Sequence, residues 1–138
     1  MRKLDQRGVS SFEFCIVLIP FLMSIFVIFD LGRYAITMQS LRAYANAGAR
    51  AAMIGNCYVE PVLAKQEPTC STADLSAVDK SKISPFLGAS AALSLTAGSG
   101  VLTVTAEDDS FVMAMTPLTK PLWPASFDKP STSTEIPF

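Results

Sequence analysis

The stretch from Val9 to Phe29 constrains the fold most, because Glu13 is the only charged residue in it. At about 1.5 Å per residue, a helix over this stretch is on the order of 32 Å long, enough to cross a hydrocarbon core of roughly 30 Å. Pro20 predicts a bend or local unwinding near Ile16–Pro20. We therefore predict a transmembrane helix over residues 9–29. The alternative is a buried helix of a soluble protein, which rarely stays apolar on every face for so many turns.

The charges that flank this stretch predict its orientation. Three basic residues precede it: Arg2, Lys3 and Arg7. Basic residues close to a span tend to stay in the cytoplasm. We therefore expect a cytoplasmic N-terminus and an extracytoplasmic segment from Asp30 onward, although Arg33 and Arg42 lie near the far end.

A cleavable secretory signal peptide fits the sequence less well. Its apolar region covers about 7–15 residues and ends near a small-x-small cleavage pattern. Here the apolar run is longer, and the first such pattern, Ala45-Asn46-Ala47, lies well beyond its end. Cleavage after the span is therefore not expected, whereas cleavage before it would leave the anchor on the mature protein.

The two ends of the apolar stretch carry a pattern known from pili. Gly8 is followed by four residues and then by Glu13 and Phe14, and the stretch ends in Asp30-Leu31-Gly32-Arg33. The string RGVSSFEF…P…FDLGR resembles TadE-like proteins of tight-adherence (Flp) pilus systems over about residues 7–54. Its first part resembles the prepilin-peptidase site of type IV pilins and pseudopilins.

This resemblance implies a processing site and an assembly residue. A prepilin peptidase would remove residues 1–8 as a leader peptide, cutting between Gly8 and Val9. Glu13 and Phe14 belong to the same processing and assembly motif. In pilins the matching glutamate engages the N-terminal amine of a neighbouring subunit. The amine of the same chain and the lipid headgroups are alternative partners for Glu13.

The resemblance also implies a location, partners and a function. Asp30, Gly32 and Arg33 form the membrane exit motif. The expected location is the bacterial inner membrane, with a single pass and a periplasmic domain that lies either at the base of the pilus or within it. The implied partners are the lipid membrane, a prepilin peptidase, other pilin-like subunits and the pilus assembly platform. The implied function is that of a minor pilin-like (pseudopilin) subunit in pilus assembly and adhesion. The alternative is an unprocessed single-span membrane protein with a periplasmic protein-interaction domain.

Composition argues against several other function classes. The net charge of −1 indicates no nucleic-acid surface, and the absence of histidine removes the commonest general base and metal ligand. Asp108 and Asp109 bring no nucleophile or partner base with them, and Glu107-Asp108-Asp109 lacks the ligand spacing of a calcium loop and is expected to be a solvated turn. We therefore expect no enzyme, no cofactor, no metal site and no nucleic-acid partner.

The cysteines differ by location. Cys15 lies in the apolar stretch, where a thiol behaves as a small hydrophobe. Cys57 and Cys70 flank a proline-containing loop outside the membrane, and in an oxidising compartment they are a candidate disulfide. Such a bridge would contribute about 3 kcal/mol in the chain-entropy model. Two free thiols or half of a zinc site are the alternatives, although zinc needs further ligands.

A heptad-like pattern beyond Asp30 predicts that the helix continues to about residue 54. Its apolar seam consists of Leu31, Tyr34, Met38, Leu41, Ala45, Gly48 and Ala52. Polar residues fall on the other faces: Arg33, Thr37, Gln39, Arg42, Asn46 and Arg50. The small residues at the end of the seam allow a sheet or another helix to pack closely, a coiled-coil dimer being the alternative. Gly55-Asn56 supplies a stop signal.

The remaining residues, 56–138, predict a small extracytoplasmic domain that follows a helical extension over residues 30–55. We expect a loop over Asn56–Cys70 and a short helix from about Ala73 to Ser84 that follows a capping-box pattern and ends at Pro85. Three apolar side chains of this helix should point inward: Leu75, Val78 and Ile83.

Alternating residues then predict a β-hairpin around Ala97–Gly100, with strands carrying Leu93 and Leu95 on one side and Leu102, Val104 and Ala106 on the other. Ser110–Met115 is predicted as a third strand, and Ser131–Ile136 as a ragged edge strand or loose chain. Residues 117–130 should be irregular, with Trp123 as an anchor on the sheet. The predicted fold class is α+β and pilin-like: a long transmembrane helix, then a short helix and an antiparallel sheet of about three strands.

Overall fold

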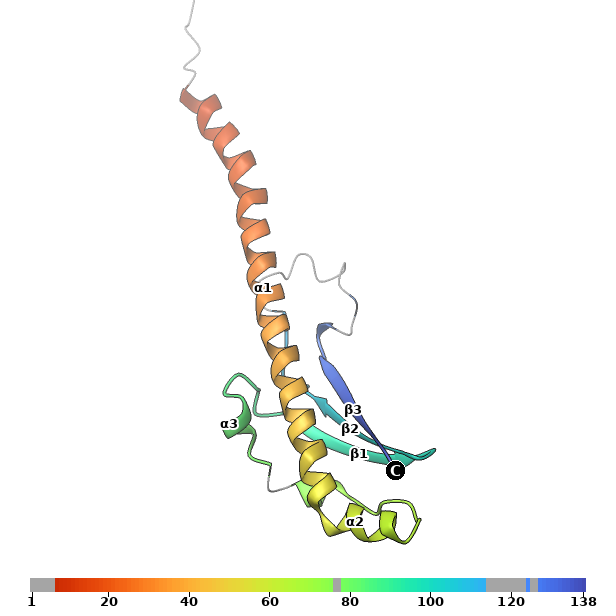
Figure 1. Cartoon of the computed structure of the whole chain (residues 1–138). Coiled ribbons are helices and arrows are strands. Elements are labelled where there is room, and N and C mark those ends of the chain that lie inside the picture. The colour runs from red at the N-terminus through yellow and green to blue at the C-terminus, as the bar shows by residue number, and fades with distance from the viewer. Residues whose placement is uncertain (1–6, 76–77, 114–123, 125–126) are drawn as a thin grey trace, which may run out of the picture.

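The computed structural model describes residues 7–75, 78–113, 124 and 127–138, with side chains described from residue 11 onward. Figure 1 shows a long helix whose C-terminal half lies against a small domain. The elements in chain order are α1 (Arg7–Ile54), α2 (Asn56–Leu63), the 3₁₀ turn η1 (Thr72–Leu75), α3 (Lys80–Ile83), β1 (Ala92–Gly98), β2 (Val101–Glu107) and β3 (Ser131–Pro137). The predicted fold class, a long apolar helix followed by short helices and a three-stranded antiparallel sheet, is confirmed.

Helix α1 runs unbroken for 48 residues. It continues through Pro20, so of the predicted bend or local unwinding the unwinding is wrong, while the bend stays a prediction. A proline removes only one hydrogen-bond donor, and the bonds on either side hold the helix. The Ser24 hydroxyl donates to the Pro20 carbonyl at 2.8 Å. The helix ends at Ile54, where the predicted stop begins, and the Gly55 N–H closes the last turn on the carbonyls of Ala51 and Ala52.

The sheet has the order β1-β2-β3, and both pairs are antiparallel. The predicted hairpin is confirmed, because β1 and β2 are joined by the two-residue turn Ser99-Gly100. Both turn residues have positive φ, 55° and 78°, as a tight hairpin turn requires. In the central strand the side chains of Leu102, Val104 and Ala106 are fully buried.

The inner face of the sheet packs on the apolar seam of α1. The seam's core residues are buried: Leu41, Ala45, Gly48 and Ala52. A Cβ atom added to Gly48 would lie 2.9 Å from Leu93 Cδ1 and 3.2 Å from Val104 Cγ1. The predicted close approach of a sheet to the small residues is therefore confirmed. The pattern was wrong at two positions: Thr37, which it placed on a polar face, is buried, and Leu31, the first residue of the seam, is exposed.

The third strand is β3, not Ser110–Met115. Residues 110–113 form a turn and irregular chain, while 114–115 lie outside the described residues. The chain leaves the sheet after β2 because the Asp108 carboxylate binds the N–H and hydroxyl of Ser110. The edge position beside β2 is taken by β3, with Ile136 opposite Leu102.

The predicted loop Asn56–Cys70 contains the helix α2, although Pro61 lies inside it. Pro61 has no N–H to donate to the carbonyl of Cys57, four residues earlier. That carbonyl accepts a hydrogen bond from the Thr69 N–H at 3.1 Å instead. The disulfide Cys57–Cys70, with a Cα–Cα distance of 4.8 Å, holds the returning chain beside α2.

The helix predicted over residues 73–84 is replaced by two shorter pieces, η1 and α3. Asp79 begins α3 by accepting a hydrogen bond from the Ser81 N–H at 3.0 Å, and Ser84 ends it just before Pro85. The three inward side chains were predicted correctly, because Leu75 is buried and Val78 and Ile83 pack on the core. Trp123, the predicted anchor, lies outside the described residues.

Candidate assembly and membrane-exit sites

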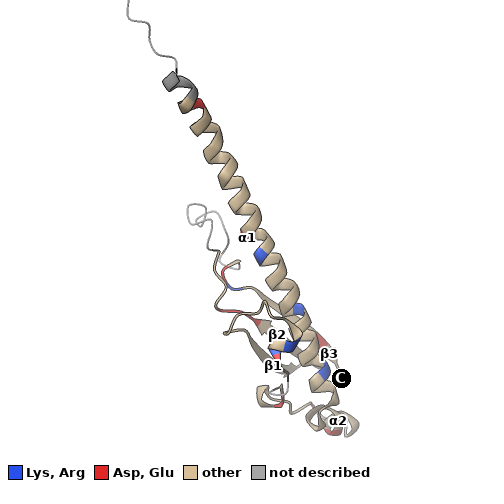
Figure 2. Ribbon diagram, turned by 90° about the vertical axis from the view of Figure 1, so that its left-hand side faces the viewer, with Lys and Arg blue, Asp and Glu red and all other residues tan. Residues whose placement is uncertain are grey.

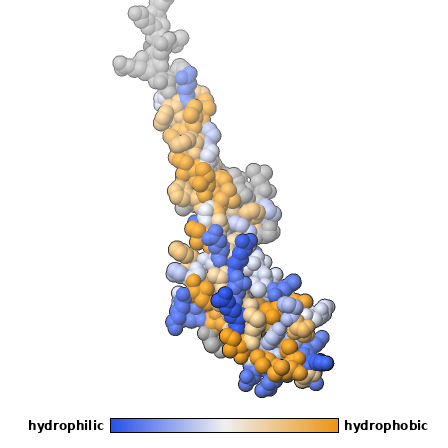
Figure 3. Space-filling model, viewed as in Figure 1, coloured by the Kyte–Doolittle hydropathy of each residue, from blue (hydrophilic) through white to orange (hydrophobic). Residues whose placement is uncertain are grey.

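The first half of α1 has the surface of a membrane span. Its large apolar side chains are exposed, and the upper part of Figure 3 shows apolar surface along the face in view. Few of its side chains are buried by the rest of the chain, and its length and apolar composition are sufficient to cross a membrane. Figure 2 shows an acidic position near the start of the described helix and then a long uncharged stretch. The single apolar helix therefore indicates a membrane-anchored protein.

Glu13 is the only charged side chain of this stretch and is exposed. Phe12 and Phe14 beside it are 67% and 64% exposed. Gly8 and Val9 lie in the first turns of α1, and in a helix Val9 and Glu13 share one face. Among the described residues, none donates a hydrogen bond to Glu13 or forms an ion pair with it. Its carboxylate is therefore available to a group outside the described part of the chain.

The exit motif is packed against the C-terminal half of the sequence. Asp30 is 1% exposed, and its Oδ1 lies 3.6 Å from Nη1 of Arg33. The Arg33 guanidinium lies 5.6 Å from the ring centroid of Phe111. The Tyr34 ring, one residue further on, contacts Phe111 edge-on at 5.9 Å and Phe127 at 4.6 Å. The motif therefore fixes the chain that follows β2 to the helix at the exit from the span.

Gly32 differs from the rest of the exit motif. A Cβ atom added to it would meet nothing within 4 Å. A side chain at position 32 would therefore have open space around its first carbon among the described residues.

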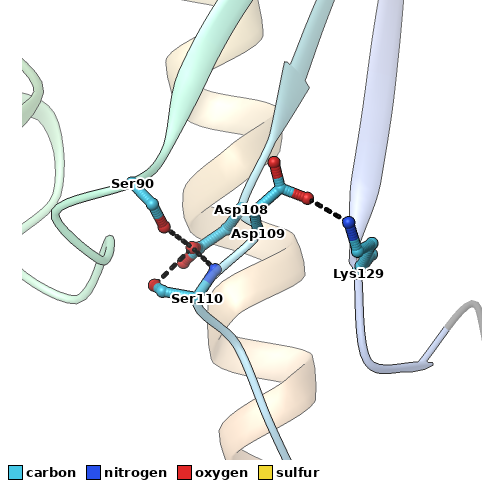
Figure 4. A network of polar contacts seen from close by, with 5 residues as sticks. All are labelled: Ser90, Asp108, Asp109, Ser110 and Lys129. Carbon is cyan, nitrogen blue, oxygen red and sulfur yellow. Dashed lines mark hydrogen bonds and ion pairs between the residues drawn. The ribbon is translucent and has the colours of Figure 1, made fainter.

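A second polar cluster lies at the end of β2, where sequence reasoning expected a solvated turn. Asp108 is 3% exposed. Its carboxylate accepts from the Ser90 hydroxyl at 2.9 Å and from the Ser110 hydroxyl at 2.6 Å (Figure 4). It also accepts from the Gly88 N–H at 3.2 Å. Asp109 points away and pairs with Lys129 at 2.9 Å. The solvated-turn prediction is therefore wrong for Asp108, which ties the chain before β1 to the end of β2.

Burial of Asp108 raises the pKa of its carboxyl, but the hydrogen bonds from Ser110, Ser90 and Gly88 outweigh this and hold the pKa below its usual value. A signal for the cluster was present in the sequence, because an aspartate two residues before a serine favours an Asx turn. Asp79 and Ser81 repeat the pattern at α3.

The lowered pKa predicts how stability depends on pH. In the unfolded chain an aspartate has a pKa of about 3.9. When the pKa is lower in the folded state, the carboxylate stabilises the fold at pH values above about 3.9. This stabilisation is lost as the pH falls through the folded pKa. We expect Asp108→Asn to lower the free energy of unfolding by about 1–2 kcal/mol at pH 7. The hydrogen-bond donors that bind the carboxylate would then face a neutral amide, which is a weaker acceptor. The difference from wild type should shrink below pH 4, measured by urea unfolding in detergent.

The matched control is Asp109→Asn, which removes an exposed carboxylate that pairs with Lys129. Its unfolding midpoint should stay near that of wild type, because exposed ion pairs contribute little. A constant difference between Asp108→Asn and wild type at all pH values would contradict the assigned role of the carboxylate.

Within the residues that the structure describes, no group of three or more acidic or cysteine side chains could hold a metal ion. Cys15 has a free, exposed thiol on the apolar half of α1.

One membrane-length helix whose second half carries a small α+β domain indicates a membrane-anchored protein. A family model of TadE-like proteins matches residues 8–50, which begin at Gly8 and include Glu13 and the exit motif. The N-terminal segment of the chain is therefore similar to TadE-like proteins. No curated protein and no solved structure matches the chain.

Proposed function

We propose that this chain is a minor pilin-like (pseudopilin) subunit of a tight-adherence pilus. The observation that carries the proposal is the match to TadE-like proteins, which starts at Gly8 and runs along the exposed apolar helix into the domain. The role is structural rather than catalytic. A prepilin peptidase removes the leader after Gly8, and the mature chain, in the inner membrane with its domain in the periplasm, joins other pilin-like subunits and the assembly platform.

The exposed position of Glu13 supports an assembly role. A carboxylate on the lipid-facing side of a span is unfavourable, and such residues usually pair with another group. Cleavage before Val9 creates an α-amine one helical turn away from Glu13. The amine of a neighbouring subunit would neutralise Glu13 and set the stagger between two apolar helices.

The experiment that tests the proposal is the mass of the mature chain, which must lack residues 1–8. The second candidate, an unprocessed single-span protein with a periplasmic interaction domain, retains them. The long exposed helix is compatible with both candidates, so the N-terminus decides between them.

The proposed topology predicts a pattern of thiol labelling. With the domain outside the cytoplasm, Cys57 and Cys70 stay paired and do not react with a membrane-impermeant maleimide added to intact cells. A reductant added to the cells should make both reactive, while Cys15 in the span stays unlabelled. Labelling without reductant would contradict the bridge, and labelling after cell lysis alone would contradict the orientation.

A further inference from the structure

The end of the domain nearest the apolar half of α1 carries exposed apolar side chains. Ile36, Phe86 and Val112 are 47%, 69% and 49% exposed, and we call them the juxtamembrane patch. Ile36 and Phe86 line one groove together with Arg33 and Phe111, and Val112 follows Phe111 in sequence. The patch thus joins three segments: α1, the loop after α3 and the chain after β2.

The height of the patch follows from helix geometry. Ile36 lies seven residues after Phe29, the last apolar residue of the span, or about 10 Å along the axis at 1.5 Å per residue. Helical side chains lean toward the N-terminus, which here is the direction of the membrane. The headgroup region adds about 5–7 Å to each side of the hydrocarbon core. The groove around Ile36 therefore lies at the outer edge of the headgroups.

The side chains of the patch are of the kinds that suit the headgroup region of a membrane. Phe86 and Val112 supply apolar surface. Arg33, which is half-exposed and pairs with Asp30, supplies a cation three residues nearer the span than Ile36. Apolar groups combined with arginine are typical of surfaces that rest in the membrane interface, where the apolar parts enter the headgroup boundary and the cation meets phosphate.

The loop that presents Phe86 is held from three sides. The Ser84 hydroxyl donates to the Ser40 hydroxyl of α1 at 2.8 Å. Lys80 Nζ donates to the carbonyls of Gly88, Ala89 and Ala91. The Gly88 N–H donates to Asp108, and a Cβ at Gly88 would lie 2.2 Å from Ser110 Oγ. An exposed phenylalanine on a loop that is fixed in this way is a preformed contact surface.

We propose that the juxtamembrane patch docks on the bilayer surface, so that the domain rests on the headgroups instead of standing away from the membrane on α1. We assign lipid as the partner because α1 is continuous with the span. The helix that carries Ile36 therefore holds the patch at the level of the headgroups. The proposal requires α1 to be a membrane anchor, but it is independent of leader cleavage and of any pilus.

The distal end of the domain provides a matched control. Ile54 and Leu63 are 80% and 79% exposed, more than Phe86. Ile54 lies eighteen residues beyond Ile36, or about 27 Å further along α1, out of reach of the headgroups. If exposed apolar side chains bound lipid wherever they lie in the domain, both ends would contact lipid equally. Docking on the bilayer surface instead predicts lipid contact at the juxtamembrane patch alone.

The test uses tryptophan fluorescence of the full chain in phospholipid vesicles. Trp123, the single tryptophan, is replaced by phenylalanine, and Phe86→Trp or Leu63→Trp is added. Brominated phospholipids should remove most of the fluorescence of Phe86→Trp and leave Leu63→Trp unchanged, while acrylamide should quench mainly Leu63→Trp. Equal quenching of the two variants by brominated lipid, or none in either, would overturn the proposal.

A second measurement keeps Trp123 in place, in case its replacement prevents folding. A photoreactive benzophenone analogue of phenylalanine is placed at Phe86 or at Leu63 in the full chain in vesicles. Cross-linking of lipid from position 86 and not from position 63 is the expected result. Cross-links from position 86 to protein alone, as when another subunit covers the patch, would contradict docking on lipid.

Discussion

Glu13→Gln should abolish association of this chain with pilus partners while its insertion into the membrane and its leader cleavage survive. Glutamine keeps the length and shape of the side chain but removes the charge that would pair with an α-amine. A single pair of this kind is strong in a lipid environment, because neither charge has water as an alternative partner. We expect cross-linking to other pilin-like subunits to fall to background.

Glu13→Asp provides the matched control, because it keeps the charge and shortens the reach by one methylene. Partial assembly is expected from this variant. Cross-linking is measured in membranes, with expression and the mature mass checked for each variant. Wild-type assembly by Glu13→Gln would refute the role of the carboxylate and favour a glutamate that reaches the headgroups.

Gly48→Leu should separate the sheet from α1 and destabilise the domain by about 3 kcal/mol, at the upper end of what overpacking typically costs. The first carbon of a new side chain would already lie 2.9 Å from Leu93 Cδ1 and 3.2 Å from Cγ1 of Val104, a buried residue of β2. Leucine has a higher helix propensity than glycine, but this stabilises the helix by less than about 1 kcal/mol. The steric clash therefore dominates. The measurement is the midpoint of urea unfolding in detergent, followed by circular dichroism.

Gly32→Leu makes the same substitution in the same helix, where an added Cβ meets nothing within 4 Å. It should leave the unfolding midpoint unchanged or raise it slightly through helix propensity. Equal midpoints for the two variants would show that the close approach of α1 and the sheet does not limit stability.

The sequence predicted those parts of the fold that depend on local patterns. The seam of α1 was readable because its apolar residues recur at heptad spacing and become small where the sheet packs on Gly48. The β1–β2 hairpin was readable because Ser99-Gly100 accepts the positive φ of a tight turn. Both signals lie within a few residues of the structure that they specify.

The parts that were missed depend on distant partners. Strand β3 was left uncertain because its pairing with β2 joins segments far apart in sequence, and strand preference depends on such context. Helix α2 was missed because Pro61 was interpreted as a breaker, whereas Thr69 satisfies the carbonyl that Pro61 leaves free.

The candidate sites show the same division. Asp30, Gly32 and Arg33 were recognised as a motif from their order along the chain. Their contacts with the chain after β2, through Phe111, were not readable, because nothing in the local sequence specifies that segment as a partner. The cluster around Asp108 was missed for a similar reason, since Gly88 and Ser90 reach it from another part of the chain.

The most direct test of the proposed function is the intact mass of the protein extracted from membranes of cells that contain an active prepilin peptidase. The proposal predicts a chain that begins at Val9 and carries the disulfide between Cys57 and Cys70. In cells without the peptidase the leader should remain. Recovery of only the full-length chain in the presence of the peptidase would contradict the pilin-like role and leave the unprocessed single-span protein as the better account.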